Sequence, residues 1–436
     1  MVEQRHETTH DSYGLAVVLL VGLAVRFGLF THSGYVTDTQ IFEGWAERGG
    51  TYGVLSMYNR ALPGPLPDYP PLLLYVYSFV GWVVHAIQGS YEHTKTFAAA
   101  IKAPGIIADV LTFFALIKAG ERLLTRHHGV LAGALFLLLP ASWLDSTIWG
   151  QYDAIYSLLL FAAFFFIGEK RTALAGVAAG LAFAAKFQVI AFLPFLLLVA
   201  ASSGWKDVRR GLIAFTIAVI AVFLPFIVSG HTNEVVYAYT HAVGAYGVLS
   251  VDAFNIWRIV FGADARNLSD TVEVAGLPYR TWGALFYLVA LAVTARAAWV
   301  RLRNLEERER TLFVLNTGAV AAFVFFLFPT EIHERYLFAF LPLAALWGSM
   351  SRSKIFLYIG ISIVIAFNIA LVLPIESVRP IYESSGVLDR FLAGILVVLA
   401  SIAAWLMLWR TSMSGVHDVS SRNPLSQTLQ RAGIRS

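Results

Sequence analysis

The sequence predicts an all-α polytopic membrane bundle of about 12 transmembrane helices, with further surface helices in the first outer loop. Of the 436 residues, 58% are hydrophobic and only 14% are charged, and the mean hydropathy is +0.67. Ordinary soluble proteins are far less apolar. Apolar runs of about 20 residues, the length that crosses a bilayer, recur along the chain.

Ten of these runs are clear. They lie at about 13–30, 97–119, 129–146, 152–167, 210–228, 282–300, 311–328, 337–350, 355–373 and 391–409. The stretch from Thr172 to Ala201 is too long for one span, and Lys186 and Gln188 interrupt it. We therefore expect two short helices that meet at this break, inside a bundle that covers residues 13–410.

The two ends of the chain are hydrophilic. Residues 1–12 run into the first apolar segment without a small-residue cleavage site, so we expect that span to be retained. The tail at 411–436 is rich in Ser, Arg and Gly and is predicted to be disordered. Both ends are predicted to be cytoplasmic.

The orientation depends on residues 70–88, which suit either a span or an interfacial helix. If this segment lies on the outer surface, most of the 32 Lys and Arg residues fall on the cytoplasmic side. If it spans, every later basic cluster faces outward, against the positive-inside bias. We therefore place it on the surface. The outer face then carries long loops at about 31–96 and 229–281 and nearly every unusual polar motif.

Composition also restricts the chemistry. The chain has no Cys, which excludes disulfides and thiol redox reactions. We find no glycine-rich phosphate loop, no zinc-spaced pair of His and no Ser-His-Asp arrangement. We expect no cofactor and no nucleic-acid partner. The lack of a soluble nucleotide-handling domain argues against a nucleotide-sugar donor.

A charged turn lies between two apolar runs at residues 328–336. It holds Glu331, His333, Glu334 and Arg335 within five positions. A protonated His beside an Arg suits a phosphate, because both donate charge-assisted hydrogen bonds to its oxygens. The alternative is an ordinary solvated loop.

Asp38 stands at the end of the first span, at the start of a segment whose Ile41, Phe42 and Trp45 share one helical face. One interpretation is an N-cap. The other is a general base, a carboxylate that takes a proton from an acceptor hydroxyl.

Asp68 and Lys102 admit two interpretations each. Asp68 precedes Pro70 and Pro71, which suits helix capping. Lys102 and Asp109 lie seven residues apart on one helical face, so they suit a buried ion pair. Lys102 lies near the outer end of its span, where a lipid-phosphate contact is the second option.

Two further polar breaks lie in the middle of the chain. Asp145 and the run from Trp149 to Asp153 form a polar turn, which suits either sugar hydroxyls or ordinary capping. Lys186 stands in an apolar hairpin, where a solitary cation is costly unless it reaches a phosphate, a carboxylate or water.

Taken in order, these elements resemble the polyprenyl-phosphate-sugar-dependent glycosyltransferases of the GT-C superfamily. They are similar to the bacterial relatives of GPI mannosyltransferases and, more distantly, to ER glucosyltransferases that extend lipid-linked oligosaccharide. The resemblance covers roughly residues 10–350 and depends on the order of the motifs. The series runs Asp38, Asp68 to Pro71, Lys102 to Asp109, Gly150 to Asp153, Lys186 to Gln188 and His333 to Tyr336.

The resemblance implies a role for each motif. Asp38 corresponds to the general base, and the donor phosphate falls to His333, Arg335, Lys102 and Lys186. The sugar or the acceptor falls to Asp68, Gln151, Asp153, Gln188 and Tyr336. Some branches have two adjacent acidic residues where this chain has Asp38 and Thr39. This chain therefore lacks the adjacent pair of carboxylates that would suggest a metal site, and we expect metal-independent catalysis.

The implied reaction takes a hexose, mannose or glucose, from a polyprenyl-phosphate donor. The acceptor is a lipid-linked glycan, a glycolipid or a protein outside the cytoplasm, and the anomeric carbon is inverted. The loop at 229–281 matches nothing in the resemblance, but its aromatic residues could stack on sugars of the acceptor. These are Tyr237, Tyr239, Tyr246, Phe254 and Trp257.

Two other classes suit a bundle of this kind. A transporter or flippase of lipid-linked glycan predicts polar residues along a path through the membrane and usually repeated halves. Here the polar motifs gather at one face. A ligase that moves a whole glycan from polyprenyl diphosphate differs in the donor that it consumes.

Overall fold

The computed structural model describes residues 2–242, 244–373, 375 and 386–409. All of the tail at 411–436 lies outside these residues. The described part is a helical bundle with one two-stranded hairpin. This confirms the predicted all-α class.

The first half of the bundle contains α1 (Val2–Leu29), α2 (Val36–Tyr52), η1 (Val54–Ser56), α3 (Pro71–Gln88), α4 (Lys95–Leu123), α5 (Arg126–Leu138), α6 (Pro140–Trp143), η2 (Leu144–Trp149), α7 (Asp153–Gly168), α8 (Thr172–Ala185), η3 (Phe187–Ala191), α9 (Leu193–Ser203) and α10 (Trp205–Val228). The second half contains α11 (Thr232–Thr240), α12 (Ile256–Phe261), η4 (Gly262–Arg266), β1 (Glu273–Val274), β2 (Leu277–Pro278), α13 (Tyr279–Leu302), α14 (Glu307–Leu327), α15 (Phe340–Ser349), α16 (Arg352–Val372) and α18 (Gly386–Trp409).

Each predicted span is helical, but several are short. Seven described helices are long and apolar enough to cross a membrane, and a bent pair makes an eighth if it counts as one span. The bend of 50° lies between α5 and the helix Pro140–Trp149, because Pro140 lacks the N–H that would continue the hydrogen-bond ladder. The apolar helices α7, α8, α9 and α15 fall below the usual span length. The break between α8 and α9 lies where Lys186 and Gln188 predicted it.

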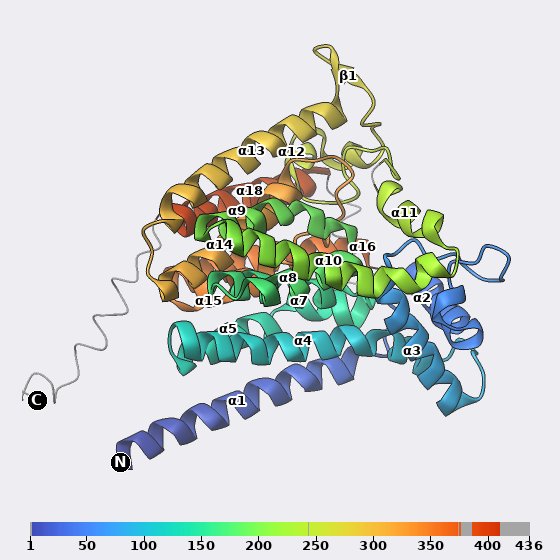
Figure 1. Cartoon of the computed structure of the whole chain (residues 1–436), viewed down its shortest axis with the longest axis horizontal. Helices are drawn as coiled ribbons and strands as arrows, with labels where there is room; N and C mark the ends of the chain where they lie inside the picture. Colours follow the sequence, from blue (N-terminus) through green and yellow to red (C-terminus); the bar gives the residue numbers. More distant parts are fainter. Residues whose placement is uncertain (1, 243, 374, 376–385, 410–436) are drawn as a thin grey trace, which may run out of the picture.

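The helices α2 and α3 lie together at one end of the bundle. Figure 1 shows both at the right-hand end, inclined to the long helices, and shows the start of α1 and the end of α18 at the opposite end. The two helices approach closely, since a Cβ added at Gly81 would lie 1.8 Å from the Ala46 carbonyl oxygen. By length and hydropathy α3 also qualifies as a span. Its predicted surface position therefore stays a prediction.

Candidate functional site

The charged turn at 328–339 joins α14 to α15 at the end of the bundle where α2 and α3 lie. The loop at 229–281 contacts it from one side. The Val251 N–H donates to the Ile332 carbonyl oxygen over 2.9 Å, and Asp252 forms a β-bridge with His333. Asp252 is itself held by Arg258, at 2.5 Å between carboxylate and guanidinium. A segment that the motif series did not include thus positions His333.

Within the turn, Glu334 lies close to both His333 and Arg335. Its carboxylate accepts a hydrogen bond from Arg335 Nη1 at 2.6 Å and lies 3.7 Å from His333 Nδ1. Burial opposes ionisation of Glu334, but the charge of Arg335 and the contact with His333 outweigh it and lower its pKa to about 2. Burial, reinforced by Arg335, lowers the pKa of His333 below its ordinary value. His333 is therefore neutral near pH 7 without ligand, unlike the protonated His expected above, and it offers a phosphate one N–H.

Asp153 balances the two buried cations. Its Oδ1 accepts a hydrogen bond from Lys186 Nζ at 2.7 Å, and its Oδ2 lies 3.7 Å from Arg335 Nε. The Lys186 ammonium also lies over the ring of Tyr69, and the Arg335 guanidinium over the ring of Trp149. Lys186 thus reaches a carboxylate, which was one of its three predicted partners. Arg335 Nε has no hydrogen-bond acceptor among the described residues.

Asp38 accepts hydrogen bonds from the turn at 149–151. Trp149 Nε1 and Gln151 Nε2 donate to its Oδ2 over 2.9 and 2.8 Å. The other end of the Gln151 amide accepts from the Tyr69 hydroxyl at 3.2 Å. The N-cap of α2 is Tyr35, so the capping interpretation of Asp38 is wrong. Gln151 connects Asp38 to Tyr69.

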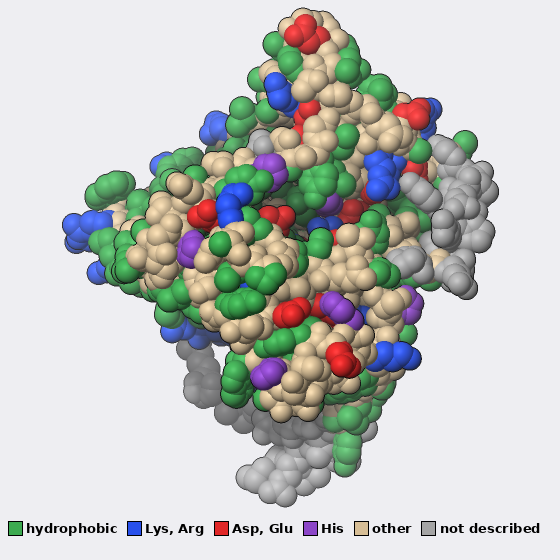
Figure 2. Space-filling model, turned by 90° about the vertical axis from the view of Figure 1, so that its right-hand side faces the viewer, with side chains coloured by type: hydrophobic (Ala, Val, Ile, Leu, Met, Phe, Trp, Pro, Cys, Tyr) green, Lys and Arg blue, Asp and Glu red, His purple; other side chains and the backbone are tan. Residues whose placement is uncertain are grey.

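The cations and Tyr69 line one cavity of about 110 Å³ at this end of the bundle. Its lining includes Asp68, Tyr69, Lys186, Gln188, Tyr246, His333, Arg335 and Tyr336. Figure 2 looks onto this end, where charged and His side chains surround a hollow. A second chamber of about 570 Å³ shares part of this lining and extends between the start of α13 and the end of α14.

Several predicted site residues lie elsewhere. Gln151 and Asp153 are fully buried and do not line the cavity, and their contact with sugar or acceptor stays a prediction. Asp153 binds Lys186 and lies near Arg335, and Gln151 forms hydrogen bonds with Asp38 and Tyr69. Asp68 does line the cavity, and its capping interpretation is wrong because the N-cap of α3 is Pro70.

The predicted ion pair between Lys102 and Asp109 is also wrong. Asp109 binds Arg26 at 2.8 Å, with both side chains fully buried. Lys102 Nζ donates to the His32 carbonyl oxygen at 2.5 Å and does not line the cavity. The spacing along α4 predicted that Lys102 and Asp109 share one helical face, but the cation that pairs with Asp109 is Arg26 of α1.

Of the aromatic residues predicted to stack on sugars in the loop at 229–281, most serve packing. Phe254 and Trp257 are buried, and the Tyr239 ring stacks on Phe183 at 4.8 Å. Tyr237 and Tyr246 are the two exposed members of the predicted set. Only Tyr246 lines the cavity.

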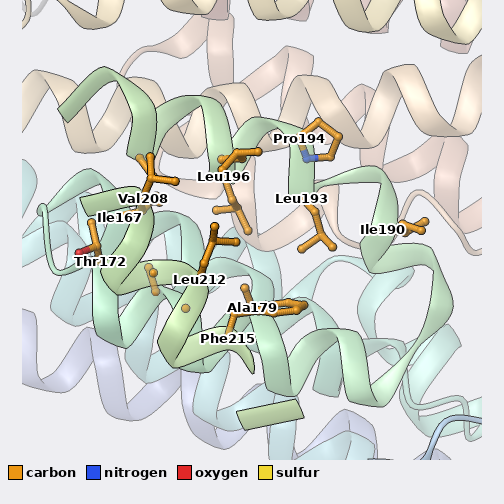
Figure 3. Close-up of a pocket in the computed structure, with 15 residues that line it drawn as sticks. Ile167, Thr172, Ala179, Ile190, Leu193, Pro194, Leu196, Val208, Leu212 and Phe215 are labelled. Atoms are coloured by element: carbon orange, nitrogen blue, oxygen red, sulfur yellow. The ribbon is translucent and has the colours of Figure 1, made fainter. Parts of the chain in front are cut away.

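A third cavity, of about 400 Å³, lies between α8, α9 and α10 (Figure 3). Thr172 is the one polar side chain in its lining, which otherwise consists of residues such as Leu193, Leu212 and Phe215. It has no group for acid, base or phosphate chemistry. The polar cavity is therefore the candidate site.

Some contacts in the site could not be predicted from the sequence. Tyr69 and Trp149 stood inside quoted motifs, but nothing in the sequence indicated that they contact Gln151 and Asp38. Arg26 lay inside an apolar run without a motif. Among the described residues no three His, Asp or Glu side chains lie close enough to hold a metal ion. The expectation of metal-independent catalysis stays a prediction.

Comparison of the fold shows similar solved structures. The ArnT structure from Cupriavidus metallidurans bound to undecaprenyl phosphate is 13% identical, with 91% of this chain and 77% of that chain covered and a TM-score of 0.51. The oligosaccharyltransferase from Archaeoglobus fulgidus is 12% identical, with 91% and 54% covered and a TM-score of 0.45. The likeness to ArnT confirms the GT-C fold.

Comparison of the sequence identifies the family. No curated protein matches the chain. The model of glycosyltransferase family 87 matches residues 68–330, which is more than half of the chain. Asp38 and His333 lie outside the matched range, so the match does not test their roles. The chain belongs to glycosyltransferase family 87, within the GT-C fold that its bundle and motif order predicted.

Proposed function

We propose that this membrane glycosyltransferase transfers a hexose, mannose or glucose, from a polyprenyl-phosphate sugar to a lipid-linked glycan, a glycolipid or a protein on the outer face. One observation carries the proposal. Lys186, His333, Arg335 and Tyr69 line a single cavity, and hydrogen bonds run from Tyr69 through the buried Gln151 to Asp38, which lies outside the lining. Groups suited to a phosphate and a carboxylate suited to a hydroxyl thus belong to one site.

The donor phosphate lies against Arg335 and His333. Arg335 supplies the N–H groups that Glu334 does not occupy, and Lys186 adds positive charge from behind. Binding of the anion raises the proton affinity of His333, because it offsets the repulsion from Arg335. The phosphate is a good leaving group, so stabilising its charge replaces a strong general acid.

Asp38 acts as the general base. Its carboxylate takes the proton of the acceptor hydroxyl as that oxygen attacks the anomeric carbon. The bond from the anomeric carbon to the phosphate oxygen breaks, and its electron pair leaves with polyprenyl phosphate. Attack from the face opposite the phosphate inverts the anomeric configuration. Trp149 and Gln151 fix the carboxylate for this step.

The test is Asp38→Asn, which keeps an oxygen for both hydrogen bonds but removes the base. We expect turnover of synthetic polyprenyl-phosphate sugars to fall by roughly 10²–10⁴-fold while donor affinity persists. Glu47→Gln is the matched control, since Glu47 is an exposed carboxylate on the same helix. Wild-type turnover in Asp38→Asn removes Asp38 as the base. Donor movement across proteoliposomes without sugar transfer favours a flippase instead.

The proposed outer orientation has its own test, which benefits from the absence of Cys. Val274→Cys lies on the hairpin at the site end, and Lys118→Cys lies near the other end of α4, with the native side chains 43% and 79% exposed. A membrane-impermeant maleimide should label the first in intact cells and the second only after permeabilisation. The reverse pattern places the site in the cytoplasm.

A further inference from the structure

The two chambers of the site meet at a small set of shared side chains. The cavity of about 110 Å³ carries the cations, and the chamber of about 570 Å³ is lined largely by apolar groups. Both are lined by Phe187, Gln188, Ala242, Tyr246 and Tyr336. Two of these residues contact His333, since the ring centroids of Tyr246 and Tyr336 lie 4.6 and 5.0 Å from that of the imidazole.

Tyr246 presents its ring at this junction. Its side chain is 54% exposed although it lines both chambers. The ring meets the His333 imidazole in a T-shaped contact, with 4.6 Å between centroids. The backbone N–H groups of Gly244 and Tyr246 donate to Glu331 Oε2 over 3.0 and 3.4 Å. Glu331 therefore holds the loop while the aromatic ring stays available.

Gln188 supplies an unused acceptor beside this ring. It is only 6% exposed, its amide lies beside the Tyr336 hydroxyl, and its buried Oε1 has no hydrogen-bond partner among the described residues. An unpaired acceptor on a residue that lines a cavity leaves a hydrogen bond open to a ligand group. A hydroxyl donor inside the chamber completes the pairing.

We propose that Tyr246 and Gln188 form the pocket for the donor sugar. The ring of Tyr246 stacks on the apolar C–H face of the pyranose, and Gln188 Oε1 accepts a hydrogen bond from a sugar hydroxyl. This inference rests on the proposed function and assigns the exposed tyrosine to the donor, not to the acceptor. Phosphate contacts hold every polyprenyl phosphate, whereas these two residues select the sugar.

The experiment measures binding of two probes to the full chain in nanodiscs. The probes are a polyprenyl-phosphate hexose and the same polyprenyl phosphate without sugar. Tyr246→Leu and Gln188→Leu should each weaken binding of the sugar-bearing probe about tenfold and leave the sugar-free probe unchanged. Tyr246→Phe should bind both probes normally, because stacking needs the ring alone. Binding of the sugar-free probe also verifies that each variant is folded.

Tyr237→Leu is the matched control, since Tyr237 is an exposed tyrosine of the same outer loop that lines neither chamber. Equal weakening of both probes in Tyr246→Leu overturns the sugar pocket, as does unchanged binding of both. If the wild-type chain binds neither probe, the proposed function itself fails. The two failures are thus distinguishable.

Discussion

Asp153 offers the sharpest test of the electrostatics of the site. The substitution Asp153→Asn keeps the size of the side chain and an oxygen for Lys186 Nζ, which now lies 2.7 Å from Oδ1. It removes the negative charge shared by Lys186 and Arg335, whose exposed fractions are 3% and 9%. Arg335 keeps Glu334 at 2.6 Å, but Lys186 loses its contacting carboxylate, and breaking a buried pair in this way costs about 3–5 kcal/mol. We expect the free energy of unfolding to fall by that amount.

The control is an ion pair of the same chemistry in water. Glu121 binds Lys118 at 2.9 Å, but the lysine side chain is 79% exposed. Exposed pairs contribute about 1 kcal/mol or less, so Glu121→Gln should change stability little. Denaturant titration of both variants in the same detergent gives the two free energies. If Asp153→Asn costs no more than Glu121→Gln, the buried charges do not depend on Asp153 and the reasoning is refuted.

A ligand should reverse part of the loss. Polyprenyl phosphate brings a negative charge to Arg335, so it should raise the stability of Asp153→Asn more than that of the wild-type chain. Equal stabilisation of both proteins contradicts a phosphate position beside these cations.

Two further predictions concern acid and the interior of the bundle. Because the pKa of His333 is lowered, the unfolded chain takes up its proton first, and stability falls as the pH drops below the usual His pKa of 6.5. The pKa of Glu334 is about 2 in the folded chain against 4.5 normally, so a second loss follows between those values. Denaturant titration across the pH range should show that His333→Asn lacks the first loss of stability and that Glu334→Gln lacks the second. If both variants keep the wild-type pH profile of stability, the assignment of these losses to His333 and Glu334 is contradicted. Asp109→Asn should cost about 3–5 kcal/mol by stranding Arg26. Lys102→Met should cost far less, because its ammonium contacts a carbonyl and no carboxylate, and equal losses in denaturant titration contradict this difference.

The fold was largely predictable because its signals are local. The lengths of the apolar runs predicted the helices, and Lys186, which interrupts one such run, predicted the break between α8 and α9. The length of each helix was less predictable. Pro140 bends one predicted span, and polar turns shorten α8 and α15, so fewer helices reach full span length than the number of apolar runs suggests.

The candidate site was predictable as a set of motifs but not as a set of contacts. His333, Arg335 and Lys186 share a cavity, as the resemblance implied. Asp153 and Gln151 were expected to meet the sugar, yet both lie behind the lining. Polar residue types identify a site, whereas burial decides which of them face its interior.

Hydrophobicity and charge sign act residue by residue along the chain, so the order of the amino acids is enough to predict a membrane helical bundle with its polar motifs at one end. The partners of the polar side chains depend on how the helices pack together. Asp109 pairs with Arg26 and not with Lys102, and Asp38 accepts from Trp149 and Gln151 and does not cap its own helix. Spacing tells which residues share a face of one helix, but the packing of separate helices decides what that face meets.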